Sequence, residues 1–143
     1  MLRTFFGKLA LLLGLLVSGF GARAADADVL SPDAALALAS QGQLQIIDVR
    51  TPGEWADSGI PAGAAMIDLS EGAERFLAGV EQLLGGDKTK PIAVICRSGH
   101  RSTNAKRLLE ANGYSHVGNI IEGVMGGPNG PGWKARGLPM EPR

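Results

Sequence analysis

The chain has 143 residues, with 14 lysines and arginines against 14 aspartates and glutamates, and it contains a single cysteine. This length suits one ordinary domain, and the balanced charge argues against a surface that binds nucleic acid or anionic membranes. One cysteine excludes an internal disulfide, and no His/Cys cluster has the spacing of metal ligands, so we expect no metal site.

The first 24 residues have the three parts of a secretory signal peptide. Arg3 and Lys8 give a positive start, an apolar stretch follows over residues 9–20, and Ala22-Arg23-Ala24 fits the small-x-small cleavage pattern. The apolar stretch is shorter than the roughly 20 residues that a spanning helix needs. A lipoprotein would need a cysteine at the cleavage site. We therefore expect a periplasmic or secreted domain of residues 25–143, free of the membrane after signal cleavage.

Beyond this leader, stretches typical of helices alternate with stretches typical of buried strands. Ser31-Pro32-Asp33 has the residue types of a helix start, and we expect a short helix over residues 34–40. Residues 44–49 form a short apolar run of the kind found in buried strands. A helical turn, a second short strand and a longer helix with Ser70 as its N-cap are expected over residues 54–57, 65–69 and 70–84.

The second half repeats the alternation with a strand, a helix and a last strand over residues 91–95, 102–112 and 117–121. Alternating strands and helices predict an α/β fold with a central, mainly parallel sheet and helices on both faces. Ligands bind beyond the carboxyl ends of such strands, so we expect Asp48, Cys96 and Glu122 to lie at one edge. Residues 118–132 are rich in glycine and proline, which indicates either a loose surface loop or a rim over the Cys96 crevice.

Cys96 is the strongest candidate for a reactive residue. It opens a turn between a strand and a helix, where backbone N–H groups and the helix dipole favour a thiolate. Arg97 and Arg101 add positive charge, and Gly99 allows the chain to wrap around an anion. Most free cysteines are small buried apolar residues, but this combination favours a nucleophilic thiol that handles anions.

Three patches, in this order along the chain, resemble the rhodanese family of sulfurtransferases. The first has the Asp-Val-Arg signature followed by an acid and an aromatic residue, the second is the cysteine loop that ends in Gly-x-Arg-Ser, and the third is a Trp followed by Gly-x-Pro. They occupy residues 46–55, 96–102 and 132–139. The resemblance covers most of the mature chain, from about Ser31 to Pro139.

The resemblance implies a rhodanese-like α/β fold and a ping-pong reaction through a persulfide on Cys96, for which we expect no metal or organic cofactor. The donor is a small sulfur-containing anion such as thiosulfate, and the acceptor is cyanide or a thiol, which a partner protein can supply. It implies that Asp48 and Arg50 brace the loop as structural support. The expected substrate-binding residues follow the cysteine: Arg97, Ser98, Gly99, His100, Arg101 and Ser102. We expect a monomer.

The chain departs from the family pattern in two places. The family usually has Gly-His-Ile-Pro-Gly-Ala after the first signature, whereas residues 58–64 lack the histidine, and Ala62 looks inserted. The glycine- and proline-rich stretch before Trp133 is also longer than a minimal domain needs. We expect altered local packing at the first place and altered access to the crevice at the second.

Two other functions fit the same cysteine. A phosphatase or arsenate reductase also cradles an oxyanion in a Cys…Arg loop, but related phosphatases have one more residue between the two than the run from Cys96 to Arg101. A persulfide carrier would hold the sulfur for a partner protein without efficient turnover. The motif does not separate a carrier from an enzyme.

Overall fold

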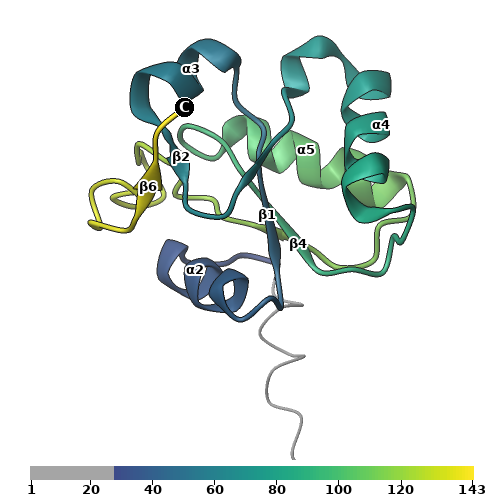
Figure 1. Ribbon diagram of the computed structural model, residues 1–143, viewed down its shortest axis with the longest axis horizontal. Coiled ribbons are helices and arrows are strands. Elements are labelled where there is room, and N and C mark those ends of the chain that lie inside the picture. The colour runs from purple at the N-terminus through teal and green to yellow at the C-terminus, as the bar shows by residue number, and fades with distance from the viewer. Residues whose placement is uncertain (1–27) are drawn as a thin grey trace, which may run out of the picture.

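Residues 28–143 are described by a computed structural model, and the predicted signal peptide of residues 1–24 lies outside them. Their centre is a four-stranded sheet in the order β3-β1-β4-β5, in which every pairing is parallel (Figure 1). The strands are β1 (Gln45–Asp48), β3 (Ala65–Met66), β4 (Ile92–Ile95) and β5 (Val117–Asn119). This confirms the predicted α/β fold.

The two faces of the sheet are covered by different helices, because successive strand side chains point to opposite faces. Ile47 and Val94 pack with α4 (Ala73–Leu84) and α5 (His100–Ala111), whereas their neighbours Ile46 and Ile95 pack with α2 (Pro32–Ser40). Both strands are therefore buried on both faces, as the continuous apolar runs predicted. Cys96 falls on the α4/α5 side of this alternation.

The register brings the ends of β1 and β4 together. Asp48 lies opposite Ile95 on one side and opposite Met66 on the other. The segments that follow β1 and β4 therefore leave the sheet at the same edge. The first forms α3 (Pro52–Ser58), and the second forms the Cys96 loop and α5.

Several predicted boundaries are wrong. Ser70 does not cap α4. Its hydroxyl and its backbone N–H both donate to Asp68, which caps a single 3-10 turn, η1 (Leu69–Glu71). Gly72, with φ at +105°, separates that turn from α4. The helix after Cys96 begins at His100 and not at residue 102, and the strands at 65–69 and 117–121 are shorter than predicted.

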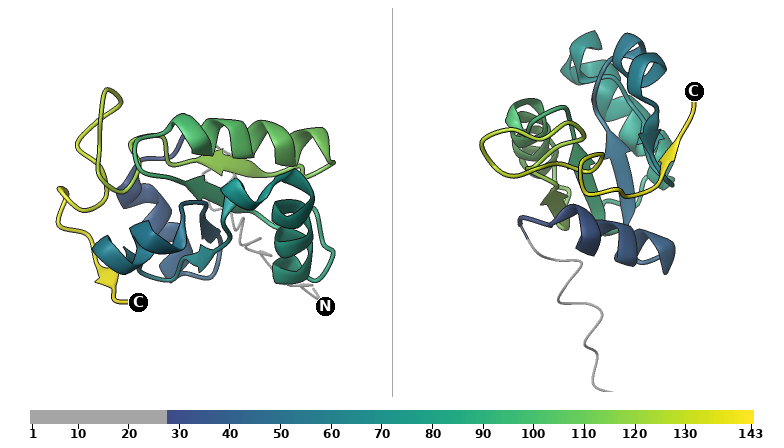
Figure 2. Two further views of the ribbon diagram at one scale, coloured as in Figure 1. Left: turned by 90° about the horizontal axis from the view of Figure 1, so that it is seen from above. Right: turned by 90° about the vertical axis from the view of Figure 1, so that its left-hand side faces the viewer.

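A second, two-stranded sheet was not predicted from the sequence. β2 (Ile60–Pro61) pairs antiparallel with β6 (Met140–Glu141), so the C-terminal segment returns to lie beside the residues that directly follow α3 (Figure 2). Gly59 fits this crossing because a Cβ there would lie 2.6 Å from the carbonyl oxygen of Glu141. The unusual residues 58–64 are thus built around a close backbone approach.

In residues 28–143, no helix has the length and apolar character to cross a bilayer. Within the same part of the chain, no three His, Cys, Asp or Glu side chains converge in a way that would hold a metal ion.

Candidate active site

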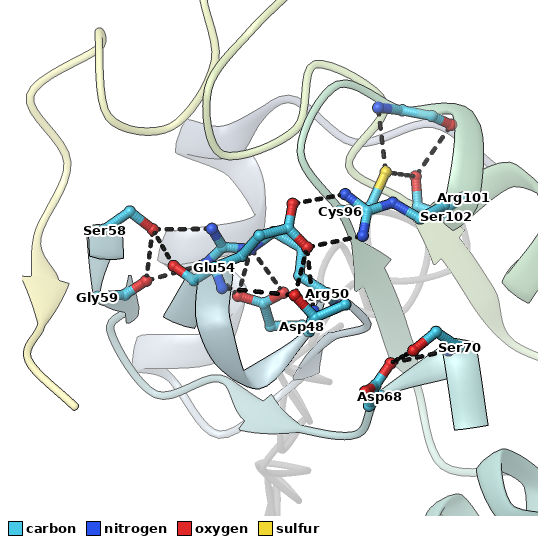
Figure 3. Close-up of polar contacts among 12 residues, drawn as sticks. Asp48, Arg50, Glu54, Ser58, Gly59, Asp68, Ser70, Cys96, Arg101 and Ser102 are labelled. Carbon is cyan, nitrogen blue, oxygen red and sulfur yellow. Dashed lines mark hydrogen bonds and ion pairs between the residues drawn. The ribbon is translucent and has the colours of Figure 1, made fainter. Parts of the chain in front are cut away.

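Cys96 lies directly after β4 and is 1% exposed. Its Sγ accepts a hydrogen bond from the backbone N–H of Gly99 at 3.2 Å, and its thiol donates to Oγ of Ser102 at 3.4 Å (Figure 3). Gly99 is the N-cap position of α5, which has no side-chain cap. The cysteine sulfur therefore sits where an anion at a helix N-terminus is stabilised by N–H groups and by the helix dipole.

Gly99 is required by the loop geometry. Its φ is +103°, and a Cβ at this position would lie 2.2 Å from the carbonyl oxygen of Ile121. Its own carbonyl accepts hydrogen bonds from the hydroxyls of Ser102 and Thr103, at 3.1 and 2.7 Å. Asn119 of β5 in turn donates to the Thr103 hydroxyl at 3.0 Å. The loop is thus fixed by α5 and β5 together.

Arg101 forms a two-pronged ion pair with Glu54 of α3. Nη1 donates to Oε2 at 2.8 Å and Nη2 donates to Oε1 at 2.7 Å, and the two side chains are 34% and 24% exposed (Figure 3). The hydrogen bonds from Arg101 are the main reason that the pKa of Glu54 is lowered to about 2, with those from Thr51 contributing less. Glu54 appears in the sequence as the acid after the first signature, but sequence reasoning gave it no role.

Asp48 and Arg50 form a buried ion pair, with the side chains 0% and 1% exposed. Arg50 Nη2 donates to Asp48 at 2.7 Å and to the carbonyl oxygen of Gly59 at 2.9 Å, while Nη1 donates to Ser58 at 2.8 Å. The pair therefore connects the end of β1 to the C-terminal end of α3. This geometry suits the structural role that the family resemblance implied.

No side-chain hydrogen bond among the described residues defines a role for Arg97, Ser98 or His100. Arg97 and His100 are exposed, and Ser98 is half-buried. Their assignment as substrate-binding residues stays a prediction.

The glycine- and proline-rich segment packs directly against the Cys96 loop. The N–H groups of Val124 and Met125 donate to the carbonyl oxygens of Cys96 and Arg97, at 2.8 and 2.9 Å. Gly123 is needed here, because a Cβ on it would lie 2.2 Å from the carbonyl oxygen of Arg97. In Figure 2 the segment, drawn in yellow-green, lies beside the start of α5. It is therefore an anchored rim of the site.

Glu122 follows β5, at the edge of the sheet where it was expected. Its side chain contacts the glycine- and proline-rich segment and the residues after it. Its carboxylate accepts hydrogen bonds from the N–H of Gly132 at 3.1 Å and from Arg136 at 2.8 and 2.6 Å. The Arg136 hydrogen bonds lower the pKa of Glu122. Arg136 also pairs with Asp33 at 2.9 Å. Asp48 and Glu122 are thus each held by an arginine, Arg50 and Arg136 respectively.

A family model described as "Rhodanese-like domain" matches residues 31–127. The chain belongs to the rhodanese-like family. This rhodanese-like domain is 32% identical over 108 residues to an uncharacterized protein of Rickettsia rickettsii, the RP600 homolog, covering 73% of this chain and 88% of the relative. The family resemblance stated from the three sequence patches is confirmed.

Two further comparisons concern named sulfur-transferring proteins. Thiosulfate sulfurtransferase PspE of Escherichia coli is 37% identical over 73 residues, which is 51% of this chain and 64% of PspE. The solution structure of the polysulfide-sulfur transferase homodimer from Wolinella succinogenes matches with a TM-score of 0.59 and 28% identity, and the match covers 85% of this chain and 84% of that one.

Proposed function

We propose that this rhodanese-like domain is a sulfurtransferase that carries a sulfane sulfur as a persulfide on Cys96. The observation that carries the proposal is the position of Sγ, which accepts the Gly99 N–H at the uncapped start of α5. A persulfide places its negative charge on the outer sulfur, and backbone N–H groups at a helix start stabilise such a charge without a metal. The name of the relative PspE supports thiosulfate as one donor.

The proposed reaction has two balanced steps. In the first, the Cys96 thiolate attacks the outer sulfur of thiosulfate, the sulfur–sulfur bond of the donor breaks, and sulfite leaves with the bonding electron pair. In the second, cyanide or a thiolate attacks the outer sulfur of the persulfide, and the Cys96 thiolate is the leaving group. Ser102, within hydrogen-bonding distance of Sγ, is placed to donate to the thiolate in both steps.

Two features favour sulfur transfer over phosphatase chemistry. The run from Cys96 to Arg101 is one residue shorter than the phosphatase pattern, which leaves less room for a phosphate group. Both terminal nitrogens of Arg101 also donate hydrogen bonds to the Glu54 carboxylate. A phosphatase would need the same two nitrogens to bind two oxygens of the phosphate.

The test is the intact mass of reduced protein after incubation with excess thiosulfate. We expect a gain of one sulfur atom, which cyanide removes with release of thiocyanate, and no gain for Cys96→Ser. Multiple turnover with cyanide supports an enzyme, and single loading with slow release supports the carrier alternative. No gain of sulfur from thiosulfate or from an organic thiosulfonate would contradict the proposal.

We also propose that residues 1–24 direct export and are removed, so that the sulfurtransferase acts in the periplasm or outside the cell. The charged start, apolar stretch and Ala-x-Ala site support this. The mass and first residue of protein purified from the periplasm of a Gram-negative host test it. A mature protein that begins at Ala25 is expected, and full-length protein in the cytoplasm would contradict export.

A further inference from the structure

One carboxylate, that of Glu54, performs two tasks at the site. Its Oε2 accepts from the backbone N–H and the hydroxyl of Thr51, at 3.1 and 3.0 Å, and so closes the capping box at the start of α3. The same carboxylate holds Arg101 through both of its oxygens. The first signature of the chain is thereby connected to the Cys96 loop by a charge pair.

This pair changes the charge that an incoming sulfur donor meets. Hydrogen bonding to Glu54 is the largest cause of the raised pKa of Arg101. Figure 3 shows the Arg101 guanidinium on the same side of the loop as the Cys96 sulfur. Arg101 therefore remains a cation beside the thiol, but a carboxylate at hydrogen-bonding distance compensates its charge. A second negative charge on the donor gains less attraction here than it would beside an unpaired arginine.

We propose that Glu54 is a specificity-determining residue that favours monoanionic sulfur donors over dianionic ones by compensating the charge of Arg101. The inference rests on the proposed sulfurtransferase function and adds the class of donor. The preferred class comprises thiosulfonates, organic persulfides and other donors with one negative charge at the transferred sulfur. Thiosulfate, a dianion, belongs to the disfavoured class.

Methanethiosulfonate and thiosulfate form a matched pair of probes. In each, the Cys96 thiolate attacks the outer sulfur and the sulfur–sulfur bond breaks. The leaving group is methanesulfinate, with one charge, in the first case and sulfite, with two, in the second. Both reactions leave the same persulfide on Cys96, so cyanide resolves both by the same second step. The ratio of the two kcat/KM values therefore reports how the site treats the extra donor charge.

Glu54→Gln is the informative variant, because glutamine is accepted at the third helical position of a capping box and removes only the charge. We expect its kcat/KM ratio of thiosulfate to methanethiosulfonate to rise about tenfold over the wild type, the order of effect of one charge a few ångströms away in partly screened surroundings. Thr51→Ala is the matched control. It removes the capping hydroxyl and leaves the ion pair, so its ratio is expected to equal that of the wild type.

Arg101→Gln supplies the opposite test, since it leaves the Glu54 charge uncompensated and should lower the same ratio. This variant keeps the inference testable if Glu54→Gln does not fold. An unchanged ratio in Glu54→Gln, or an equal shift in Thr51→Ala, would overturn the role of Glu54.

A readout that needs no sulfur transfer separates this inference from the proposed function. Alkylation of Cys96 by iodoacetate, an anion, is compared with alkylation by neutral iodoacetamide. We expect the rate ratio of iodoacetate to iodoacetamide to rise in Glu54→Gln and to fall in Arg101→Gln. If the wild type accepts no sulfur but these ratios shift, the sulfurtransferase proposal fails and the charge role of Glu54 stands. If sulfur is transferred and neither ratio shifts, the role of Glu54 fails alone.

Discussion

The hydroxyl of Ser102 lies between the sulfur of Cys96 and the carbonyl oxygen of Gly99. It donates to the carbonyl of Gly99 at 3.1 Å and accepts from the thiol of Cys96 at 3.4 Å. The same carbonyl already accepts from the hydroxyl and the backbone N–H of Thr103, at 2.7 and 3.2 Å. Rotation of the Ser102 hydroxyl toward an ionised sulfur therefore leaves no carbonyl without a partner.

Ser102→Ala should slow sulfur loading without unfolding the domain. The loss of one hydrogen bond to the thiolate corresponds to about 1 kcal/mol, so we expect loading by thiosulfate to be about fivefold slower. Rapid-quench mass measurement gives the loading rate. The control is Ser40→Ala, which changes an exposed serine at the end of α2, more than 50 residues before Cys96 in the sequence. A loading rate equal to that of the wild type would remove Ser102 from the reaction.

The Cys96 loop could be predicted from sequence because it is local: the sulfur, the glycine that donates to it and the serine beside it lie within seven consecutive residues. The Glu54–Arg101 pair could not, because its members are 47 residues apart and meet only once α3 and α5 are placed at the same edge of the sheet. Contacts within the loop could therefore be predicted from sequence. The pairing of Arg101 with Glu54, which sets the charge of the site, could not, because it depends on the tertiary structure.

The short helix α3 is held at both ends by side chains of the chain's first signature. Glu54 and Thr51 close its start, and Arg50 bonds to Ser58 and Gly59 at its end. A seven-residue helix is marginal on its own, so these contacts and the burial of Trp55 account for its stability. The helix in turn presents Glu54 to the Cys96 loop.

Arg50→Ala should destabilise the domain strongly. It would leave the Asp48 carboxylate, which is 0% exposed, without its cationic partner, and breaking a buried pair in this way costs about 3–5 kcal/mol. Urea unfolding monitored by tryptophan fluorescence measures the loss. Arg107→Ala, at an exposed position of α5, is the matched control and is expected to change the free energy of unfolding by less than about 0.5 kcal/mol.

The Glu54–Arg101 pair also predicts a pH dependence. The pKa of Glu54 is about 2 in the folded domain against 4.5 for an ordinary glutamate, so the pair stabilises the fold fully above about pH 4.5 and loses that contribution as the pH falls toward 2. We expect Glu54→Gln to be less stable than the wild type by about 1 kcal/mol at pH 7, since the pair is partly exposed to solvent. As the pH approaches 2 the two proteins should converge, and a constant difference in urea unfolding down to that pH would contradict this.

The elements themselves were predictable to different degrees for a physical reason. β1 and β4 are buried on both faces and read as continuous apolar runs, whereas β2 and β6 have two residues each and exist only because distant segments pair. Ser70 has the residue type of an N-cap, yet its hydroxyl donates to Asp68. Asp68, two residues earlier in the chain, is itself the cap, because its carboxylate accepts from the backbone N–H of Ser70.

Arg136, near the C-terminus, joins the first helix of the described residues to the segment after β5. Arg136 bonds to Glu122 after β5 and to Asp33 in the first turn of α2, and Trp133, 0% exposed, donates through Nε1 to the carbonyl of Pro139 at 3.0 Å. This network ties the glycine- and proline-rich segment to the sheet. The composition of residues 118–132 is typical of a mobile loop, but these contacts fix the position of the segment beside the Cys96 loop.

Glu122→Gln should release that segment while leaving the sheet intact. The variant replaces the charged acceptor of Arg136 and Gly132 by a neutral one, and charge-assisted hydrogen bonds are roughly twice as strong as neutral ones. We expect faster amide hydrogen exchange over residues 123–132, where the N–H of Met125 bonds to the Cys96 loop, and unchanged exchange in β1 and β4. Lys134→Ala, at an exposed cation next to the buried Trp133, is the control. If exchange in the segment stays at the wild-type rate, backbone hydrogen bonds alone hold the rim, and Glu122 serves only to join the termini.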